Sequence, residues 1–514
     1  MRSALLSIAP NKACGTDNIS AKVIVECAAE LVVPLTKICT MSVNTGVFPS
    51  RWKQANIIPI FKKGDKKLAQ NYRSVSLLSL FGKTLERVVY DTLFAHVAPV
   101  LCAEQHGFMP KRSCITNLAT YLNHAWEAIS DGYQTDTIYT DYSAAFQSVN
   151  HTLIIHKLEK SFNLQDHALK WFVSYLSDRR QRVIVNGKTS YWKEVTSGVP
   201  EGSILAPLIF SIFINDLPRH IQSKCLMYAD DVKIFRKIET PAGGRLLQDD
   251  LDRLAAWSAG WGLKLNPQKC QAFTMTLRRA PVHTSYFIGT SQLQKVDDIK
   301  DLGVTLDTKL TFRPHINDVV KRANRSLGVL IRSFQTGSTR RSKFDRRALL
   351  SAYYSSVRSI LEYASVIWAG AANSHTVRVD RVQHKFLMWL SHHSSSGPTP
   401  SLSYQDLCRH FRIPSLSARR LQHDLLFLRN IHSNNLNSPQ LLDSFPLNVP
   451  ARSTRNRSLF YEPRARVNTV LNGLFCRLPR VTNRFLNTRE VTADIFRDSP
   501  GIYRGHVLRY VANP

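Results

Sequence analysis

Two adjacent aspartates, Asp230 and Asp231, have a placement that suggests chemistry. They stand between two β-prone runs, residues 225–228 and 232–235, and this pattern predicts a hairpin with both acids at its tip. Adjacent like charges repel each other, and a divalent cation commonly offsets such clustering, because Mg2+ is held by one or two carboxylates together with substrate phosphates. An acidic surface turn that binds no metal is the competing interpretation.

A third acid, Asp141, occupies the same kind of position. It follows the β-rich run 137–139 and precedes a helical pattern of apolar residues that begins at Phe146 and continues to Leu158. Strand-end acids that meet in one sheet can bracket two ions, and ions about 4 Å apart activate a 3′-hydroxyl and stabilise a leaving pyrophosphate. The three aspartates therefore predict a site for in-line phosphoryl transfer.

The elements that position these acids are expected to form a mixed sheet covered by helices. Short strands separated by turns fill residues 131–308, among them a run at 182–186. Helical periodicity dominates residues 315–390. Two low-complexity patches, residues 392–398 and 451–458, are typical of linkers or exposed loops.

The charge of the chain favours a polyphosphate partner. The 514 residues carry 68 Lys and Arg against 38 Asp and Glu, a formal charge of +30. Residues 309–514 hold 32 basic and 11 acidic residues, and 28 of the basic ones are Arg, whose planar fork suits phosphate. Nucleic acid is therefore the expected partner, and a solvated basic face is the alternative interpretation.

The cysteines and the apolar stretches bear on the cellular setting. The nine cysteines are scattered and never form a C-x-x-C pair, which predicts free thiols and no structural zinc. The longest apolar stretch, residues 204–214, is too short to span a bilayer, and no secretory leader is recognisable. We therefore expect an intracellular protein with no membrane partner.

The motifs around the acids resemble, in their order, those of the reverse transcriptases of non-LTR (LINE-like, jockey-type) retrotransposons. Residues 228–231 (Tyr-Ala-Asp-Asp) are similar to the Y-x-D-D box, residues 141–146 to the first palm motif, and residues 197–207 to a motif usually read as G-V-P-Q-G-S-x-L-G-P. Further motifs follow the family order at residues 52–53, 57–65, 71–77, 105–108, 262–269 and 302–304. The resemblance extends from about residue 12 to residue 306.

This resemblance implies an α+β right-hand polymerase followed by a basic, mainly helical C-terminal region. The expected divisions are fingers at 1–130, palm at 131–308, helical thumb at 309–391 and an Arg-rich C-terminal region at 392–514, with the reverse transcriptase domain at about 42–308 overall. The implied activity is RNA-directed DNA polymerisation with two Mg2+ ions, for which Mn2+ could substitute. The implied partners are an RNA template, a DNA primer and dNTPs, and the implied location is the nucleus.

The resemblance also implies roles for individual residues. Asp141 and Asp230 would be metal ligands, and Asp231 would complete the metal and catalytic set. Phe146 resembles the steric gate that excludes a 2′-hydroxyl; a core phenylalanine is the alternative. The other implied positions are, for nucleotide binding, Lys62, Arg73, Gly202 and Lys269, and, for the primer grip, Leu302 and Gly303. Lys269 matches a proposed proton donor to pyrophosphate, although a plain surface lysine fits the sequence equally well.

Four positions depart from the family pattern. Glu201 replaces the usual Gln and, unless it is protonated or paired, is expected to weaken nucleotide binding. Gln147 and Asn150 stand where acids are usual, and Ala206 replaces a glycine. A helix is expected directly after Gly202 and Ser203, with Ser203 as its N-cap.

The chain begins only about a dozen residues before the first motif, so we expect an endonuclease acting in trans, or a fragment of a longer protein. A catalytically silent, element-derived RNA-binding protein is the alternative function. An RNA-dependent RNA polymerase is disfavoured by Phe146 and by Tyr228-Ala229 ahead of the acids.

Overall fold

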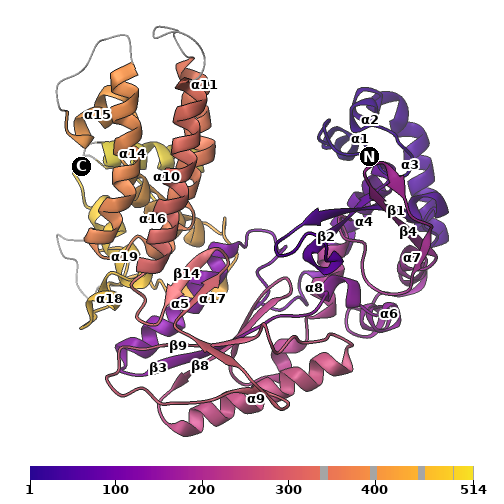
Figure 1. The fold of residues 1–514 in the computed structure, drawn as a ribbon, viewed down its shortest axis with the longest axis horizontal. Helices are drawn as coiled ribbons and strands as arrows, with labels where there is room; N and C mark the ends of the chain where they lie inside the picture. Colours follow the sequence, from indigo (N-terminus) through magenta and orange to yellow (C-terminus); the bar gives the residue numbers. More distant parts are fainter. Residues whose placement is uncertain (336–344, 394–401, 450–457, 490, 513–514) are drawn as a thin grey trace.

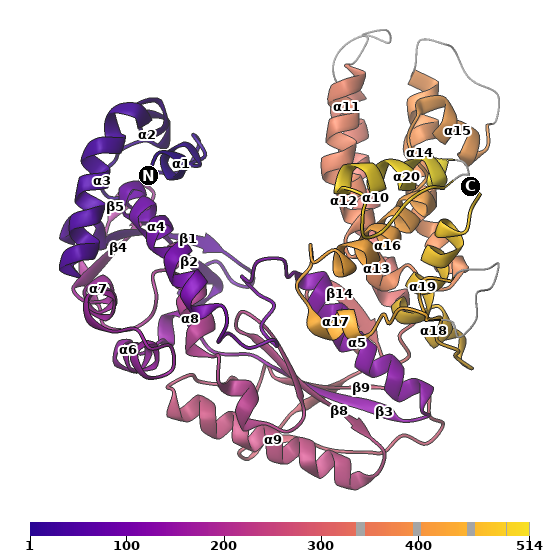
Figure 2. The ribbon, with the colours of Figure 1, turned by 180° about the vertical axis from the view of Figure 1, so that it is seen from behind.

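The structure is a computed structural model that describes residues 1–335, 345–393, 402–449, 458–489 and 491–512. Two arms stand on either side of a central sheet, and the two chain termini lie in opposite arms (Figures 1 and 2). Most of the two predicted linkers, residues 394–398 and 451–457, lies outside the described residues. His392 and His393 belong to the last turn of a helix, so this predicted linker begins later than expected.

The N-terminal arm is built on a sheet with the strand order β2-β1-β4-β5, in which β6 also pairs with β4. These strands are β1 (Gln54–Phe61), β2 (Tyr72–Leu78), β4 (Arg179–Val185), β5 (Lys188–Thr189) and β6 (Lys193–Val195). The helices of this arm are α1 (Arg2–Leu6), α2 (Ala21–Glu26), α3 (Ala28–Thr45), α4 (Leu80–Val97), α6 (His151–Lys160) and α7 (Asp166–Leu176).

The expectation that residues 131–308 share one sheet is wrong for the run at 182–186. This run belongs to β4, which pairs in parallel with β1, so that Gln54 lies opposite Arg180. β4 and β1 are far apart in the sequence. The β propensity of a run predicts that it forms a strand, but it does not predict which other strand it pairs with.

The central sheet has the strand order β12-β9-β3-β8-β7. Its strands are β3 (Gln134–Thr140), β7 (Lys224–Tyr228), β8 (Asp231–Ile238), β9 (Gln271–Met275) and β12 (Gln294–Val296). Two small antiparallel ribbons follow, made of β10 (Phe287–Ile288) with β11 (Ser291–Gln292), and β13 (Asp298–Asp301) with β14 (Val304–Asp307). Helices α5 (Cys114–Ser130), α8 (Ala206–Phe213) and α9 (Pro241–Gly260) complete this part.

The central sheet separates two hydrophobic cores. Side chains of a strand alternate between the two faces of a sheet, and β8 shows the consequence. Val232 and Ile234 enter the core that contains α8 and α9. Phe235 enters the other core, which contains α5 and the C-terminal helices. Hydrophobic cores therefore cover both faces of the central sheet. The acids lie instead at the end of the β7–β8 hairpin, at the edge of the sheet.

The C-terminal arm is helical. Its helices are α10 (Arg313–Gln335), α11 (Arg346–Tyr353), α12 (Ser359–Glu362), α13 (Ser365–Trp368), α14 (Asn373–His393), α15 (Tyr404–Phe411), α16 (Leu416–His432), α17 (Pro439–Asp443), α18 (Asn468–Leu471), α19 (Leu474–Leu486) and α20 (Pro500–Ala512). A π-helical turn at Tyr354–Arg358 links α11 to α12. A buried ion pair joins α16 to α19, with Asp424 accepting from Arg477 Nε at 2.9 Å.

The helical pattern expected after Asp141 is divided in two. Phe146 lies in a 3-10 turn, Ala145–Ser148, and α6 begins only at His151. Asn150 is the N-cap of α6, and its side chain accepts from the backbone N–H of Leu153 at 3.1 Å. The departure at Asn150 therefore places a strong capping residue at a helix start.

All nine cysteines are free, as predicted. Within the described ranges, no helix combines the length and the apolar character needed to cross a bilayer.

Candidate active site at the central hairpin

The hairpin that carries the adjacent acids forms as predicted. β7 and β8 pair antiparallel with Tyr228 opposite Asp231, and Ala229 and Asp230 make the two-residue turn. Ala229 adopts the left-handed conformation, with φ 58°, which tight turns between twisted strands commonly require. Asp230 therefore stands at the tip, and Asp231 begins the returning strand.

Asp141 lies at the same edge of the central sheet. β3 pairs with β8 so that Thr140 lies opposite Val232, which places Asp141 beside Asp231. Both carboxylates line one cavity of about 160 Å³. The Asp141 carbonyl accepts from the backbone N–H of Asn266 at 2.9 Å, which fixes this strand end. The structure thus brings together the three acids that the sequence singles out.

Neighbouring carboxylates disfavour the ionised forms of Asp230 and Asp231. Burial and the carboxylate of Asp141 raise the pKa of Asp230 above its usual value. Burial also raises the pKa of Asp231 to about 6, and the carboxylates of Asp230 and Asp301 add to this shift. A cation bound between the carboxylates would relieve this repulsion.

Among the described residues, no three His, Cys, Asp or Glu side chains are grouped so that they could hold a metal ion by themselves. Asp141, Asp230 and Asp231 therefore share one edge without forming a ready-made three-carboxylate cage. Their oxygens suit Mg2+, which usually takes one or two protein carboxylates and completes its shell with water and substrate phosphates.

The three cations expected at the site have different surroundings. Lys62 and Arg73 are exposed at the β1–β2 hairpin, and both lie near enough to Asp230 to oppose the rise in its pKa. Lys269 instead pairs with Asp141, with Nζ 3.2 Å from Oδ2. Lys62 and Arg73 thus lie exposed at the rim of the site, whereas Lys269 forms an ion pair with Asp141.

A buried glutamine, for which no role was predicted, holds the acidic turn. Gln105 is 1% exposed, and its side-chain oxygen accepts from the backbone N–H groups of Ala229 (3.0 Å) and Gly107 (2.8 Å). A Cβ on Gly107 would lie 2.3 Å from the Ala229 nitrogen. The motif at 105–108 marks these residues, but their partner is 124 positions away, so local pattern could not reveal the contact.

Arg112 connects this support to the C-terminal arm. Its guanidinium donates to the carbonyls of Ala103 (2.9 Å) and Gln105 (2.6 Å), and its Nε donates to the carbonyl of Asn437 (3.0 Å). The backbone N–H of Asn437 donates to the carbonyl of Lys111, the residue before Arg112, at 2.9 Å. The loop after α16 therefore touches the segment that holds the acidic turn.

Phe146 lies among other aromatic rings. It stacks on Phe210 of α8, with ring centroids 4.5 Å apart, and meets Phe108 edge to face at 6.3 Å. Phe146 is half-buried, and Phe108 is exposed. A ring that is held on one face and remains partly accessible has the rigidity that a steric gate needs.

Glu201 and Gln147, two of the departures from the family pattern, are partners. Gln147 Nε2 donates to Glu201 Oε1, and Ser74 Oγ donates to Oε2 at 3.4 Å. Burial raises the pKa of Glu201, and Arg73 opposes this rise. Two neutral side chains therefore hydrogen-bond to the Glu201 carboxylate.

Gly202 and Ser203 shape the start of α8. Gly202 has φ 93°, and a Cβ there would lie 2.9 Å from the carbonyl oxygen of Ser76 in β2. The Ser203 hydroxyl accepts from the N–H of Ala206 at 2.9 Å, although Ala206 itself begins the helix. The expected start directly after Ser203 is therefore two residues too early, and Pro207 in the first turn is the signal for the true start.

Leu302 and Gly303 form the sharp turn between β13 and β14, and both have positive φ, 44° and 85°. Leu302 lines the same cavity as Asp141 and Asp231. The turn expected to be the primer grip is therefore next to the carboxylates.

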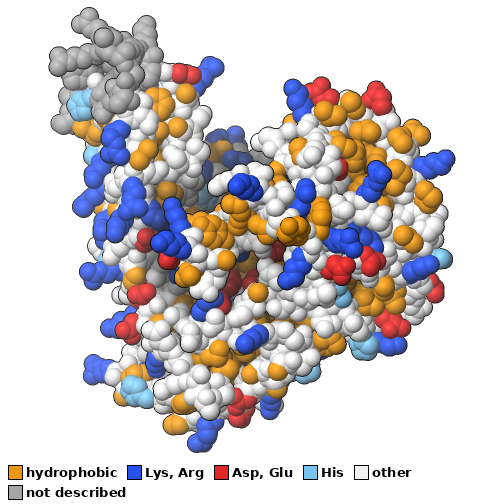
Figure 3. Space-filling model, turned by 45° about the vertical axis from the view of Figure 1, so that its right-hand side comes forward, with side chains coloured by type: hydrophobic (Ala, Val, Ile, Leu, Met, Phe, Trp, Pro, Cys, Tyr) orange, Lys and Arg blue, Asp and Glu red, His pale blue; other side chains and the backbone are white. Residues whose placement is uncertain are grey.

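The molecular surface matches this arrangement. Figure 3 shows acidic side chains at the bottom of the hollow between the arms, with Lys and Arg side chains on both sides of it. A polyanion entering this hollow meets cations first and carboxylates only at the bottom.

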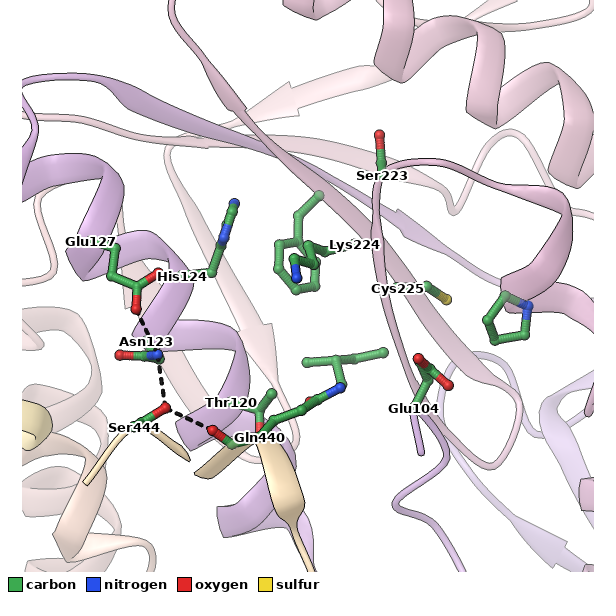
Figure 4. A pocket seen from close by; sticks show the side chains of 13 residues that line it. Glu104, Thr120, Asn123, His124, Glu127, Ser223, Lys224, Cys225, Gln440 and Ser444 are labelled. Carbon is green, nitrogen blue, oxygen red and sulfur yellow. Dashed lines mark hydrogen bonds between the residues drawn. The ribbon is translucent and has the colours of Figure 1, made fainter. Parts of the chain in front are cut away.

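A second cavity, of about 330 Å³, lies where α5, β7 and α17 meet (Figure 4). Asn123 of α5 donates to Glu127 at 2.9 Å and to Ser444 at 3.0 Å, which ties α17 to α5. Burial lowers the pKa of His124 in this cavity to about 4, so its imidazole is neutral at physiological pH. None of the three aspartates lines this cavity, which is separate from the candidate active site.

Residues 60–306 match the family model described as reverse transcriptase (RNA-dependent DNA polymerase). This range includes the three aspartates, the cations at the rim and the Leu302-Gly303 turn. The fold and the site thus define a reverse transcriptase domain.

Similar proteins define the kind of reverse transcriptase. The chain is 31% identical over 395 residues to the "Probable RNA-directed DNA polymerase from transposon BS" of Drosophila melanogaster, a match that covers 74% of this chain and 43% of that protein. It is 26% identical over 457 residues to the RNA-directed DNA polymerase from mobile element jockey of the same species, covering 85% of this chain and 48% of that protein. The chain belongs to the reverse transcriptases of non-LTR, LINE-like retrotransposons. It spans less than half the length of these curated relatives.

Proposed function

We propose that the chain copies an RNA template into DNA by adding dNTPs to a primer 3′-hydroxyl. The observation that carries this proposal is the meeting of Asp141, Asp230 and Asp231 at one sheet edge, with Lys62 and Arg73 at the rim. Carboxylates that gain from a cation, beside side chains that attract a triphosphate, suit phosphoryl transfer.

The proposed layout is that of a right hand. The central sheet is the palm, the sheet of the N-terminal arm forms the fingers, and the helices α10 to α14 form the thumb. The remaining C-terminal region, residues 392–514, adds positive charge and supports the palm through α17 and Arg112. The continuous hydrophobic core from α5 into these helices supports this arrangement.

Asp141 and Asp230 are the proposed ligands of Mg2+, and Asp231 supports the site. When bound, a pair of such ions activates the 3′-hydroxyl and stabilises the leaving pyrophosphate. Mn2+, which also prefers oxygen ligands, is the proposed substitute.

The remaining roles concern the nucleotide. Lys62 and Arg73 bind the triphosphate, Lys269 meets the leaving pyrophosphate, and the Phe146 ring occupies the space that a 2′-hydroxyl would need. Gly202 keeps the chain close against β2, where Ser74 donates a hydrogen bond to the neighbouring Glu201.

The test is primer extension on poly(rA)/oligo(dT) with dTTP and Mg2+. The chain as written should extend the primer, Asp230→Asn should abolish extension while RNA binding persists, and Asp249→Asn, on the exposed face of α9, should behave as the unaltered chain. Extension by the Asp230 variant would refute the metal assignment. Absence of extension by the unaltered chain, with RNA binding retained, would favour a catalytically silent RNA-binding protein.

The proposed partners are an RNA template, a DNA primer and an endonuclease acting in trans that supplies the primer end. The nucleus, where a genomic primer is found, is the proposed location. The charge of +30 supports a polyanionic partner.

A further inference from the structure

Tyr363 joins the thumb to the turn at Leu302 and Gly303. It directly follows α12, and its hydroxyl donates to the carbonyl oxygen of Leu302 at 2.8 Å. A Cβ on Gly303 would lie 3.0 Å from the Tyr363 ring. Because Gly303 has no side chain, the Tyr363 ring can pack directly against the turn.

The Tyr363 side chain also lies near enough to Tyr228 of the Tyr-Ala-Asp-Asp box for their phenols to influence one another. Burial, the thiol of Cys114 and the phenol of Tyr228 raise the pKa of Tyr363 to about 12. A hydrogen bond with Cys114 is also the main cause that raises the pKa of Tyr228 to about 12. The Cys114 thiol thus interacts with one phenol of the thumb and with one phenol of the box that carries Asp230.

The backbone of Tyr363 is held in place. Its carbonyl accepts from the indole N–H of Trp368 at 2.9 Å, and Trp368 is fully buried. Ala364, the next residue, takes the left-handed conformation with φ 49°. The Tyr363 side chain nevertheless remains 42% exposed, so a rigid part of the thumb presents this ring at the edge of the active-site cleft.

We infer that Tyr363 is a positioning residue that keeps the thumb against the primer-grip turn and so helps to hold the primer–template duplex in the cleft. This inference rests on the proposed function. Removing the hydroxyl loses one hydrogen bond between thumb and turn but leaves the ring and the carboxylates in place. Binding of the primer–template duplex should therefore weaken, and chemistry on the bound duplex should not.

The experiment compares the full chain with Tyr363→Phe and with Tyr353→Phe. Tyr353 is the matched control, because it is a buried thumb tyrosine whose hydroxyl donates to Gln383 at 3.0 Å inside the thumb. Fluorescence anisotropy measures the Kd for a labelled poly(rA)/oligo(dT) duplex and for single-stranded poly(rA). Single-turnover incorporation of the first dTMP, and product length in the presence of a heparin trap, measure chemistry and processivity.

Tyr363→Phe should raise the Kd for the duplex about fivefold, the usual effect of losing one neutral hydrogen bond. It should shorten trapped products and change the first-nucleotide rate less than about twofold. Tyr353→Phe should leave the duplex Kd and the product length unchanged. Equal duplex Kd values for Tyr363→Phe and the unaltered chain, or equal weakening in both variants, would overturn the inference. If no variant extends a primer, the proposed function fails, and the duplex Kd still decides the role of Tyr363.

Discussion

Replacing Gly107 by alanine should displace the acidic turn while leaving the rest of the palm intact. The added Cβ would lie 2.3 Å from the Ala229 nitrogen and 2.9 Å from the Tyr228 carbonyl carbon. Ordinary contacts begin at about 3.4 Å, so the turn must move by roughly 1 Å. Both contacted atoms belong to the backbone, and no side-chain rotation can relieve them.

The displaced backbone atoms belong to Tyr228 and Ala229, which directly precede Asp230. The displacement should therefore lower the rate of catalysis. A misplacement of about 1 Å at reacting groups costs on the order of 100-fold in rate, which corresponds to about 2.7 kcal/mol of activation free energy. We therefore expect kcat for dTMP incorporation to fall about 100-fold in Gly107→Ala. The Kd for single-stranded RNA should not change, because the substitution alters no charge on the basic surfaces that are proposed to bind phosphate.

The assay is steady-state primer extension together with a thermal melt. Gly260→Ala is the matched control, because Gly260 ends α9 in the same palm and a Cβ there meets no atom within 4 Å. Gln105→Ala, which removes the hydrogen bonds that hold the turn, should reduce kcat in the same direction. A Gly107→Ala protein with unaltered kcat and an unaltered melting temperature would refute the argument that this contact positions Asp230.

Three further predictions concern nucleotide handling and stability. Glu201→Gln should keep kcat/KM for dTTP within about threefold, because an amide at this position can still accept from Gln147; a gain of more than tenfold in the same primer-extension assay would show that the carboxylate is harmful. Phe146→Val should raise the incorporation of UTP relative to dTTP at least tenfold, since the smaller side chain leaves room for a 2′-hydroxyl, and an unchanged ratio would remove Phe146 from the gate. His106 is 1% exposed, and burial lowers its pKa to about 3. At a pH below the usual histidine pKa of about 6.5, this imidazole therefore binds a proton in the unfolded chain but not in the folded chain. Stability is therefore lost as pH falls, by about 1.4 kcal/mol at pH 5.5 for this one group, and thermal melts at pH 7.5 and 5.5 should differ less for His106→Gln than for the unaltered chain.

The parts of the site that the sequence predicted are those set by local pattern. Alternating β-prone residues on both sides of Ala229 and Asp230 specify a hairpin, and the run before Asp141 specifies a strand end. The sheet then brings these local features together through the pairing of β3 with β8. The acids at the tip and at the strand end could therefore be named before any tertiary contact was known.

The parts that the sequence missed depend on partners far away in the chain. Gln105 reaches Ala229 across 124 positions, and Gln147 reaches Glu201 across 54. Glu201, considered alone, was expected to weaken nucleotide binding, whereas in the structure its carboxylate accepts a hydrogen bond from Gln147. The sheet to which β4 belongs was likewise decided by β1, a partner more than a hundred residues away.

The central claim is that the carboxylates at this sheet edge carry out polymerisation, and single-nucleotide incorporation tests it most directly. The measurement is the rate of adding one dTMP to oligo(dT) on poly(rA), as a function of Mg2+ concentration, for the unaltered chain, Asp141→Asn and Asp298→Asn. Asp298 is an exposed acid on β13 and serves as the control. We predict Mg2+-dependent incorporation that is lost in Asp141→Asn and retained in Asp298→Asn. Equal rates for the Asp141 variant and the unaltered chain, or incorporation that does not depend on a divalent cation, would contradict the account.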